Sequence, residues 1–447
     1  MKATNSEKVI VESNTSDIFN LINSNAIPLE DERDLDPLIE SIGDSKYVLL
    51  GEASHGTHEY YSWRMKITQR LIKEKNFSFI GVEGDWPDCY RVNRFAKNYP
   101  QTENNSQDVL KKFNRWPTWM WGNWEMVAFI DWLKSYNSKL PNNKKIGFYG
   151  LDVYSFRESM DAIMNYLKNY DIVALNKAKQ VIKCFEPFGE DEGQSYAKAS
   201  ALVPKLCEQE VVNLLTDIRS KIPYYNSDAE NVFSTEQNAH VAVNAEKYYR
   251  AMIKGGPESW NIRDKHMVST IERLMKYHGN KSKIIIWEHN THIGDARATD
   301  MKKDGLLNVG QILKEQYAED GVFAVGFGSY KGSVIAGKSW GDEIKKINVP
   351  EAKVGSWEEI FHKASNEKNK LLIMDKINNK KCLMKPINHR AIGVVYNPQY
   401  EQYGNYVPSI MNERYNAFIF IDKTKALYPL FIKPDGEQIP ETYPFGV

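Results

Sequence analysis

A carboxylate and an imidazole stand three residues apart, at Glu52 and His55, directly after the apolar residues 47–50. Four apolar residues in a row are typical of a strand buried on both faces, and Gly51 and Gly56 indicate tight turns beyond it. A carboxylate beside an imidazole raises the basicity of the ring and selects one tautomer, as a general base working near neutral pH requires. The segment therefore predicts a general base on the loop after a buried strand.

Three further apolar segments end in the same way. They are residues 77–83 with Glu83, residues 145–152 with Asp152, and residues 284–288 with Glu288, which is followed by His289 and His292. The carboxyl ends of parallel strands lie at one edge of a sheet, and ligands bind there. Any one of these carboxylates alone could equally be structural, but their coincidence with histidines predicts one shared site.

Two other kinds of chemistry fit these residues less well. The spacing of His289 and His292 is not the i, i+4 pair of a helical zinc site, although carboxylates and histidines could still assemble a divalent metal site in space. Ser54 lacks the paired glycines of a nucleophile elbow, and His58, at a predicted helix start, is typical of a capping or surface residue. We therefore predict that a His–Glu pair activates water.

Two neighbouring features are candidates for contacts with the site or its ligand. Arg64 lies nine residues beyond His55 on a helix predicted over residues 58–74, where most arginines are solvated or paired. Four tryptophans fall within nine positions, at Trp116, Trp119, Trp121 and Trp124. Such a cluster forms either a knot in the core or the wall of an apolar ligand cleft, and both interpretations stay open.

The order of strand and helix patterns indicates the fold. Strands and helices alternate up to residue 155, helical patterns alone fill residues 156–278, and strand patterns return at 284–288, 322–328, 370–375 and 417–421. Successive strand–helix steps predict an α/β fold with a mostly parallel central sheet flanked by helices. We expect residues 1–155 and 279–447 to form the α/β core that carries the active site, and residues 156–278 to form a large helical insertion.

Composition is typical of a globular protein that does not cross a membrane. Of the 447 residues, 42% are hydrophobic and 26% charged. Lys plus Arg and Asp plus Glu number 58 each, so no overall field favours nucleic acid or an anionic membrane, and the expected partner is a neutral or weakly charged small molecule. Because no apolar run approaches about 18 residues and the N-terminus has no apolar signal region, we expect a cytoplasmic protein. The oligomeric state is not predicted.

The four cysteines lie far apart in the sequence, at Cys89, Cys184, Cys207 and Cys382. They show no C-x-x-C spacing, so neither a disulfide framework nor a zinc–thiolate site is indicated. The expectation is that all four are buried thiols.

Six motifs, taken together and in this order, resemble the erythromycin esterase family over nearly the whole chain. They are Gly51-Glu-Ala-Ser-His-Gly56, Gly81-Val-Glu-Gly-Asp85, Arg115-Trp-Pro-Thr-Trp-Met-Trp121, Gly150-Leu-Asp-Val-Tyr-Ser155, Trp287-Glu-His-Asn-Thr-His-Ile-Gly-Asp295 and Asn308-Val-Gly-Gln311. The family is similar to a broader group of α/β hydrolytic and haem-uptake proteins. The resemblance implies an α/β core with a helical insertion, in agreement with the order of the elements.

The resemblance also implies a bacterial hydrolase of the antibiotic-resistance type that opens a macrolide lactone with activated water, without metal or cofactor. Carried over by motif, His55 is the general base, Glu52 and Glu83 are its acidic partners, and Arg64 orients a carboxylate or stabilises developing negative charge. His289 and His292 are implied as oxyanion donors or as the acid that protonates the leaving alkoxide. We expect Trp116, Trp119, Trp121 and Asp152 to contact the substrate.

Membership of a family leaves the substrate open, since relatives include exopolysaccharide biosynthesis proteins. Two alternatives to an ester hydrolase remain: a metal-dependent hydrolase of another substrate class, and a non-catalytic protein that binds a ligand in the same cleft. One residue departs from the expected motif, because a small residue is expected where Glu288 stands. Its charge would either raise the pKa of His289 or point away from it.

Overall fold

The computed structural model describes residues 16–189, 193–202, 206–225, 228–252, 254–378 and 380–430. Its strands are β1 (Ile27–Pro28), β2 (Tyr47–Leu50), β3 (Phe79–Asp85), β4 (Gly147–Asp152), β5 (Ile284–Trp287), β6 (Val322–Ala336), β7 (Lys345–Val349), β8 (Lys370–Ile373), β9 (Ile387–Arg390), β10 (Tyr406–Ser409) and β11 (Ala417–Lys423). Seven of these, β2, β3, β4, β5, β6, β8 and β11, coincide with predicted strands. The strand β7 was not predicted because its residues are mostly polar and exposed, so no apolar run marks it.

The described residues form a nine-stranded sheet in the order β1-β8-β11-β6-β2-β5-β3-β4, with β7 paired to β6. Every neighbouring pair from β11 to β4 is parallel, while β8 is antiparallel to β11 and to β1. The predicted α/β fold with a mostly parallel sheet is therefore confirmed. A separate two-stranded ribbon pairs β9 with β10.

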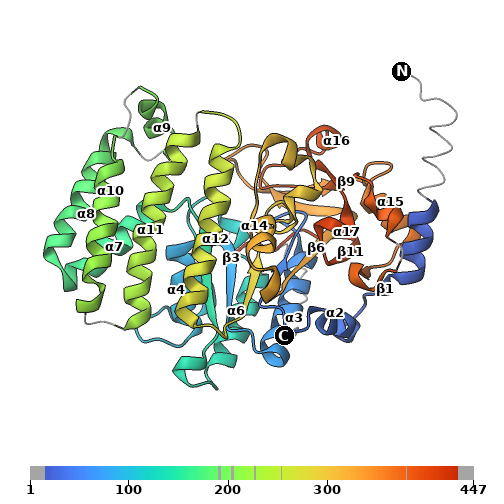
Figure 1. The fold of residues 1–447 in the computed structure, drawn as a ribbon, viewed down its shortest axis with the longest axis horizontal. Helices are drawn as coiled ribbons and strands as arrows, with labels where there is room; N and C mark the ends of the chain where they lie inside the picture. Colours follow the sequence, from blue (N-terminus) through green and yellow to red (C-terminus); the bar gives the residue numbers. More distant parts are fainter. Residues whose placement is uncertain are drawn as a thin grey trace.

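Helices surround the sheet (Figure 1). They are an unlabelled helix over 16–25, α2 (Asp36–Ile42), α3 (His58–Lys75), α4 (Trp86–Ala96), α5 (Ser106–Leu110), α6 (Trp124–Asn137), α7 (Phe156–Tyr170), α8 (Ile172–Phe185), α9 (Gln194–Ser200), α10 (Glu208–Lys221), α11 (Ala229–Met252), α12 (Glu258–His278), α13 (Asn290–Ile293), α14 (Val309–Gln316), α15 (Trp357–Ser365), α16 (Glu401–Gly404) and α17 (Met411–Arg414). The helices α7 to α12 all lie within the segment of helical patterns predicted over residues 156–278.

The two faces of the sheet carry separate hydrophobic clusters, as strand alternation requires. On one face, Val48 and Leu50 of β2 join side chains of α2, α3 and α6; on the other, Tyr47 and Leu49 join side chains of α12, α14 and α15. All four residues are buried, which explains why β2 reads as an uninterrupted apolar run. The sheet is thus the middle layer of three, and its polar strand ends are left for a site.

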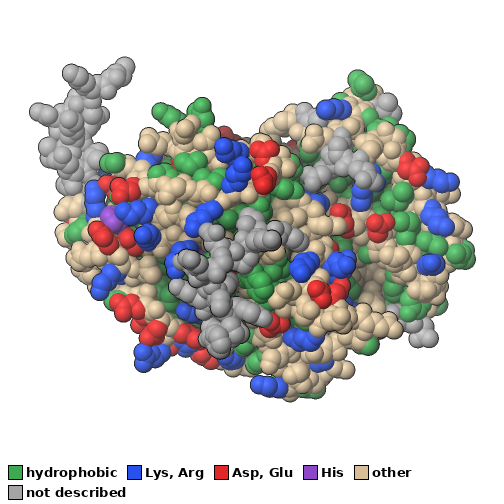
Figure 2. All heavy atoms as spheres, turned by 180° about the vertical axis from the view of Figure 1, so that it is seen from behind, with side chains coloured by type: hydrophobic (Ala, Val, Ile, Leu, Met, Phe, Trp, Pro, Cys, Tyr) green, Lys and Arg blue, Asp and Glu red, His purple; other side chains and the backbone are tan. Residues whose placement is uncertain are grey.

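The helices α7 to α11 extend beyond the β4 edge of the sheet (Figure 1). They enclose a third hydrophobic cluster that draws its members from residues 153–249, whereas α12 packs on the sheet. Whether residues 156–278 form a separate domain stays a prediction. No described helix is both long enough and apolar enough to span a bilayer, and charges of both signs are interspersed over the face shown in Figure 2.

The expectation of four free thiols is wrong, because Cys184 and Cys207 form a disulfide. They lie 23 residues apart in sequence, at the end of α8 and just before α10. Helix packing brings them together, and this pairing leaves no trace in cysteine spacing. The thiols of Cys89, which is buried, and Cys382, which is partly exposed, are free.

At Gly150 of β4, the backbone of residues 84 and 85 at the end of β3 lies so close that there is no room for a side chain. A Cβ atom added there would lie 2.4 Å from the carbonyl oxygen of Gly84 and 2.5 Å from that of Asp85. We expect Gly150→Ala to lower the free energy of unfolding by about 1–3 kcal/mol, because backbone atoms must shift. The control Gly404→Ala meets no atom within 4 Å and should change it by less than about 0.5 kcal/mol. Denaturant titration of both variants measures the difference; equal stabilities would contradict this packing argument.

Candidate active site

Four adjacent parallel strands bring their carboxyl ends to one edge of the sheet, in the order β2-β5-β3-β4. Glu52 follows β2, Glu83 lies near the end of β3, Asp152 ends β4 and Glu288 follows β5. Each of these side chains is at most 5% exposed. Four carboxylates in so little solvent require cations, hydrogen-bond donors or protons to accompany them.

Three hydrogen-bonded side chains, Arg64, Glu52 and His55, lead from the protein interior to the cleft, where His55 is the last of them. The Nδ1 atom of His55 lies 2.9 Å from Glu52 Oε1, and Arg64 Nη2 donates to Glu52 Oε2 at 2.7 Å. Arg64, in α3, is fully buried against the rings of Tyr61 and Trp287. Because Glu52 takes the Nδ1–H, the other ring nitrogen, Nε2, is the basic one, and it makes no hydrogen bond to a described residue.

The electrostatic surroundings favour a basic His55. Burial lowers the pKa of His55, but the negative charges of Glu83 and Glu52 outweigh burial and raise it above its ordinary value. Burial alone would raise the pKa of Glu83, but its neighbours His292, His55 and Arg263 hold it below its usual range. Glu83 is therefore ionised at neutral pH, which is the state that strengthens His55 as a base.

Glu83 is held by groups from three other parts of the chain. Its Oε1 accepts from Arg263 Nη2 at 2.7 Å, and its Oε2 accepts from the backbone N–H of His289 at 2.8 Å. Its own carbonyl oxygen accepts from the indole N–H of Trp121 at 3.2 Å. These contacts tie β3 to α12, to the end of β5 and to the loop that carries the tryptophans.

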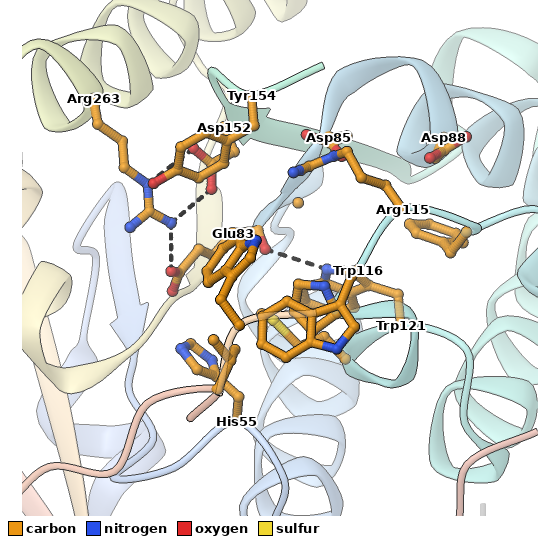
Figure 3. Close-up of a pocket in the computed structure, with 16 residues that line it drawn as sticks. His55, Glu83, Asp85, Asp88, Arg115, Trp116, Trp121, Asp152, Tyr154 and Arg263 are labelled. Carbon is orange, nitrogen blue, oxygen red and sulfur yellow. Dashed lines mark hydrogen bonds and ion pairs between the residues drawn. The ribbon is translucent and has the colours of Figure 1, made fainter. Parts of the chain in front are cut away.

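Arg263 was not predicted as a site residue, yet it lies at the centre of the ionic network in Figure 3. Its Nε and Nη2 donate to the two oxygens of Asp152 at 3.0 and 2.7 Å, and Nη2 also donates to Glu83. Its Nη1 lies 3.0 Å from Nε2 of His292. Nothing in the sequence distinguishes this arginine, because it lies in the polar helix α12, more than a hundred residues from its carboxylate partners.

Neither His289 nor His292 is among the residues that line the cleft. The ring of His289 packs 5.0 Å from that of His55, and its Nδ1 accepts from the N–H of Thr291 at 3.3 Å. His292 contacts Asp264 through Nδ1 at 2.9 Å and stacks on Trp260. His289 thus packs against His55, and His292 contacts Arg263.

Glu288 does not raise the pKa of His289. Burial, together with the neighbouring His55, lowers the pKa of His289 well below its ordinary value, so the ring is neutral. Burial, reinforced by Glu83 and Asp264, raises the pKa of Glu288 well above its ordinary value. Neither carboxyl oxygen of Glu288 has a partner among the described residues. Glu288 therefore carries a proton at neutral pH and adds no charge.

Two residues near His55 have structural contacts of their own. His58 is buried and lies 2.7 Å from Glu125 Oε1 of α6, so the expectation of a capping or surface histidine is wrong. A single sequence cannot show this, because Glu125 is 67 residues away. The hydroxyl of Ser54 pairs with that of Thr57.

The site opens into a cleft with about 680 Å³ of empty space, including the part open to solvent. Its polar lining is His55, Glu83, Asp85, Asp88, Arg115, Asp152, Tyr154 and Arg263, and its apolar lining includes Phe113, Trp116, Met120, Trp121, Trp340 and Val394. In the view of Figure 3, Trp116 and Trp121 lie on one side of the labelled residues, and Arg263 and Asp152 lie on the other. Trp119, by contrast, is fully buried in the core and does not line the cleft. The tryptophan cluster is thus partly cleft wall and partly core.

Comparisons with known proteins identify relatives over most of the chain. A family model described as erythromycin esterase matches residues 72–424, a range that includes Glu83 and Arg263 but begins after His55. Erythromycin esterase type II of Escherichia coli is 24% identical over 360 residues, which cover 74% of this chain and 81% of that protein. The putative hydrolase YbfO of Bacillus subtilis is 21% identical over 412 residues, 87% of this chain and 86% of that protein.

Solved structures share the fold. A succinoglycan biosynthesis protein superposes with a TM-score of 0.76 at 20% identity, covering 93% of this chain and 99% of that chain. A Bacillus cereus protein gives 0.77 at 20% identity with the same coverage. A variant of the erythromycin esterase EreC in its open conformation gives 0.63 at 15% identity, covering 90% of this chain and 97% of that chain. Because the family model spans most of the sequence, this chain belongs to the erythromycin esterase family.

Proposed function

We propose that this protein hydrolyses a carboxylic ester or a macrolide lactone with water activated by His55. The observation that carries the proposal is the position of His55, which lines the cleft with Nδ1 engaged by Glu52 and Nε2 making no hydrogen bond to a described residue. In this mechanism Nε2 takes a proton from water as its oxygen attacks the carbonyl carbon. The tetrahedral intermediate then collapses, and the same proton passes from His55 to the leaving alkoxide.

Arg263 is our candidate for stabilising the negative charge that develops on the carbonyl oxygen. A guanidinium has five N–H groups, and the contacts with Asp152, Glu83 and His292 engage four of them. One Nη1–H therefore remains for a substrate oxygen in the cleft that Arg263 lines. Burial lowers the pKa of Arg263, but Asp152, Tyr154 and Glu83 outweigh burial and raise it, so the group stays cationic. A preorganised cation is the kind of group that stabilises an oxyanion.

Within this proposal, Arg64 does not contact the substrate and acts instead by orienting His55 through Glu52. It does not line the cleft, and its contact with Glu52 fixes the carboxylate that orients His55. His292 in the same way supports Arg263 rather than donating to the oxyanion itself.

Replacement of His55 tests the general base. We expect His55→Asn to lower kcat for 4-nitrophenyl acetate, or for erythromycin followed by mass spectrometry, by about 10²–10⁴-fold, since proton transfer is lost. The control His362→Asn removes a histidine that pairs with Asp422 away from the cleft and should keep the wild-type rate. Full activity of His55→Asn would contradict the base assignment. Loss of wild-type activity in chelator, restored by a divalent metal, would favour a metal-dependent hydrolase instead.

The pH dependence tests the electrostatic role of Glu83. Only neutral imidazole accepts a proton, so kcat/KM should rise with pH through the titration of His55, whose pKa is raised by Glu83 and Glu52 against the effect of burial. Glu83→Gln removes one of these negative charges, lowers the pKa of His55, and should move the midpoint of the profile to lower pH. An unchanged or higher midpoint would show that another group limits the rate.

A further inference from the structure

A second chamber adjoins the catalytic cleft. It has about 740 Å³ of empty space, including the part open to solvent, which is within the range of about 300–1,000 Å³ that is usual for small-molecule sites. Arg115 and Tyr154 line both the cleft and this chamber. The two hollows therefore meet at these two side chains, and a ligand that extends past them reaches from one hollow into the other.

Tyr154 lies between the two guanidinium groups that line the cleft (Figure 3). The guanidinium carbon of Arg263 is 4.9 Å from the ring centroid of Tyr154, and the guanidinium carbon of Arg115 is 5.3 Å from it. Arg263 is the group that we assign to the carbonyl oxygen of the substrate. The chamber thus begins one aromatic ring away from the place where the ester carbonyl would bind.

More than half of the residues that line the chamber are aromatic. Besides Tyr154, they come from α7, α8, the turn after α8, α9 and α11, and they are Phe156, Phe185, Phe188, Tyr196 and Tyr249. Two further lining residues, Arg157 and Glu158, have opposite charges. The guanidinium of Arg115 is bound by the Asp85 carboxylate. The chamber therefore favours a neutral ring over an ion.

The aromatic wall is fixed by contacts within the protein. The hydroxyl of Tyr196, which is fully buried, donates to Glu246 Oε1 at 2.7 Å and accepts from the backbone N–H of Cys207 at 3.1 Å. The rings of Phe185 and Tyr196 stack with centroids 4.6 Å apart, and the disulfide between Cys184 and Cys207 closes the segment that carries both rings. A preformed wall of this kind loses little conformational freedom when a ligand binds.

The chemistry of this wall distinguishes an aromatic ligand from a saturated one. Aromatic rings in offset-stacked or edge-to-face geometry gain more free energy than burial of their area provides. A guanidinium such as that of Arg115 also stacks on aromatic faces. A saturated ring of the same size gains the burial alone, so the chamber should prefer the aromatic ring.

We propose that this chamber binds a neutral aryl group of the substrate, so that the esters this protein selects carry an aromatic ring at a distance from the reacting carbonyl. The inference rests on the proposed ester hydrolysis and adds a substrate class to it. Phe188 is a specificity-determining residue in this scheme. Its half-buried ring lines the chamber and meets the ring of Tyr196 edge-on, with centroids 5.2 Å apart.

Two matched series of esters test the selectivity. Methyl ω-phenylalkanoates and methyl ω-cyclohexylalkanoates, from the butanoates to the decanoates, have the same reacting group and differ only in the ring, and mass spectrometry follows the released acid. The cyclohexyl ester of each pair is the more hydrophobic, so burial alone would favour it. We expect wild-type kcat/KM to favour the phenyl ester by about three- to tenfold, with a preference that increases as the chain becomes long enough to reach the chamber. A ratio of one or less at every chain length would overturn the proposal.

Replacement of Phe188 locates the preference in the chamber. Phe188→Leu keeps an apolar side chain but removes one ring from the wall, and should lower the phenyl preference by about twofold or more at the longer chain lengths. Phe188→Tyr keeps the ring and should retain the preference. The control Phe19→Leu makes the same change at a half-buried site on the helix over 16–25 and should leave the ratio unchanged. An unchanged ratio in Phe188→Leu would show that the tryptophans of the cleft cause the preference, and would overturn the role of the chamber.

Binding separates this inference from the proposed activity. The corresponding methyl ketones of both series cannot be hydrolysed, and calorimetry measures their affinity. Wild type should bind the longer phenyl ketones about threefold or more tightly than their cyclohexyl counterparts, and Phe188→Leu should reduce that preference. If no ester is hydrolysed but this preference is present, the ester hydrolysis fails and the aryl site stands. If esters are hydrolysed without a phenyl preference in rate or binding, the hydrolysis stands and the aryl site fails.

Discussion

The contacts of the Glu83 carboxylate hold the two halves of the site together. Its two oxygens bind Arg263 of α12 and the backbone of His289 beyond β5, so a single side chain of β3 joins elements from three parts of the chain. Because Glu83 is buried and ionised, its charge is little screened by solvent and acts on His55 across the site. The geometry of the strand ends and the basicity of His55 therefore depend on the same group.

The other carboxyl groups at this edge of the sheet are either paired with an arginine or uncharged, which limits the repulsion between them and Glu83. Arg64 accompanies Glu52, Arg263 accompanies Glu83 and Asp152, and Glu288 holds a proton instead of a charge. A buried carboxylate without a partner is far more stable neutral than ionised, since burial penalises the charged form. Three charged carboxylates and one neutral one can thus share one sheet edge that is nearly closed to solvent.

Much of this edge could be predicted from local patterns. Apolar runs ending in Glu52, Glu83 and Asp152 indicated buried parallel strands, and the topology of such a sheet places their ends together. His55 was recognised because a histidine three residues from a carboxylate, beside a turn, is itself a local pattern. The missed strand β7 and the wrongly placed His58 lacked such a signal, since an exposed strand has no apolar run and the partner of His58 is distant in sequence.

The sequence by itself therefore determined the α/β fold, the acidic strand ends and the position of His55, because these follow from residue type and short-range spacing. Only the tertiary structure decided that Arg263 joins the carboxylates, that Trp121 lines the cleft while Trp119 is core, and that Cys184 meets Cys207. Each of these depends on how helices pack against the sheet or one another. Contacts of that kind join residues far apart in the chain, and no local pattern encodes them.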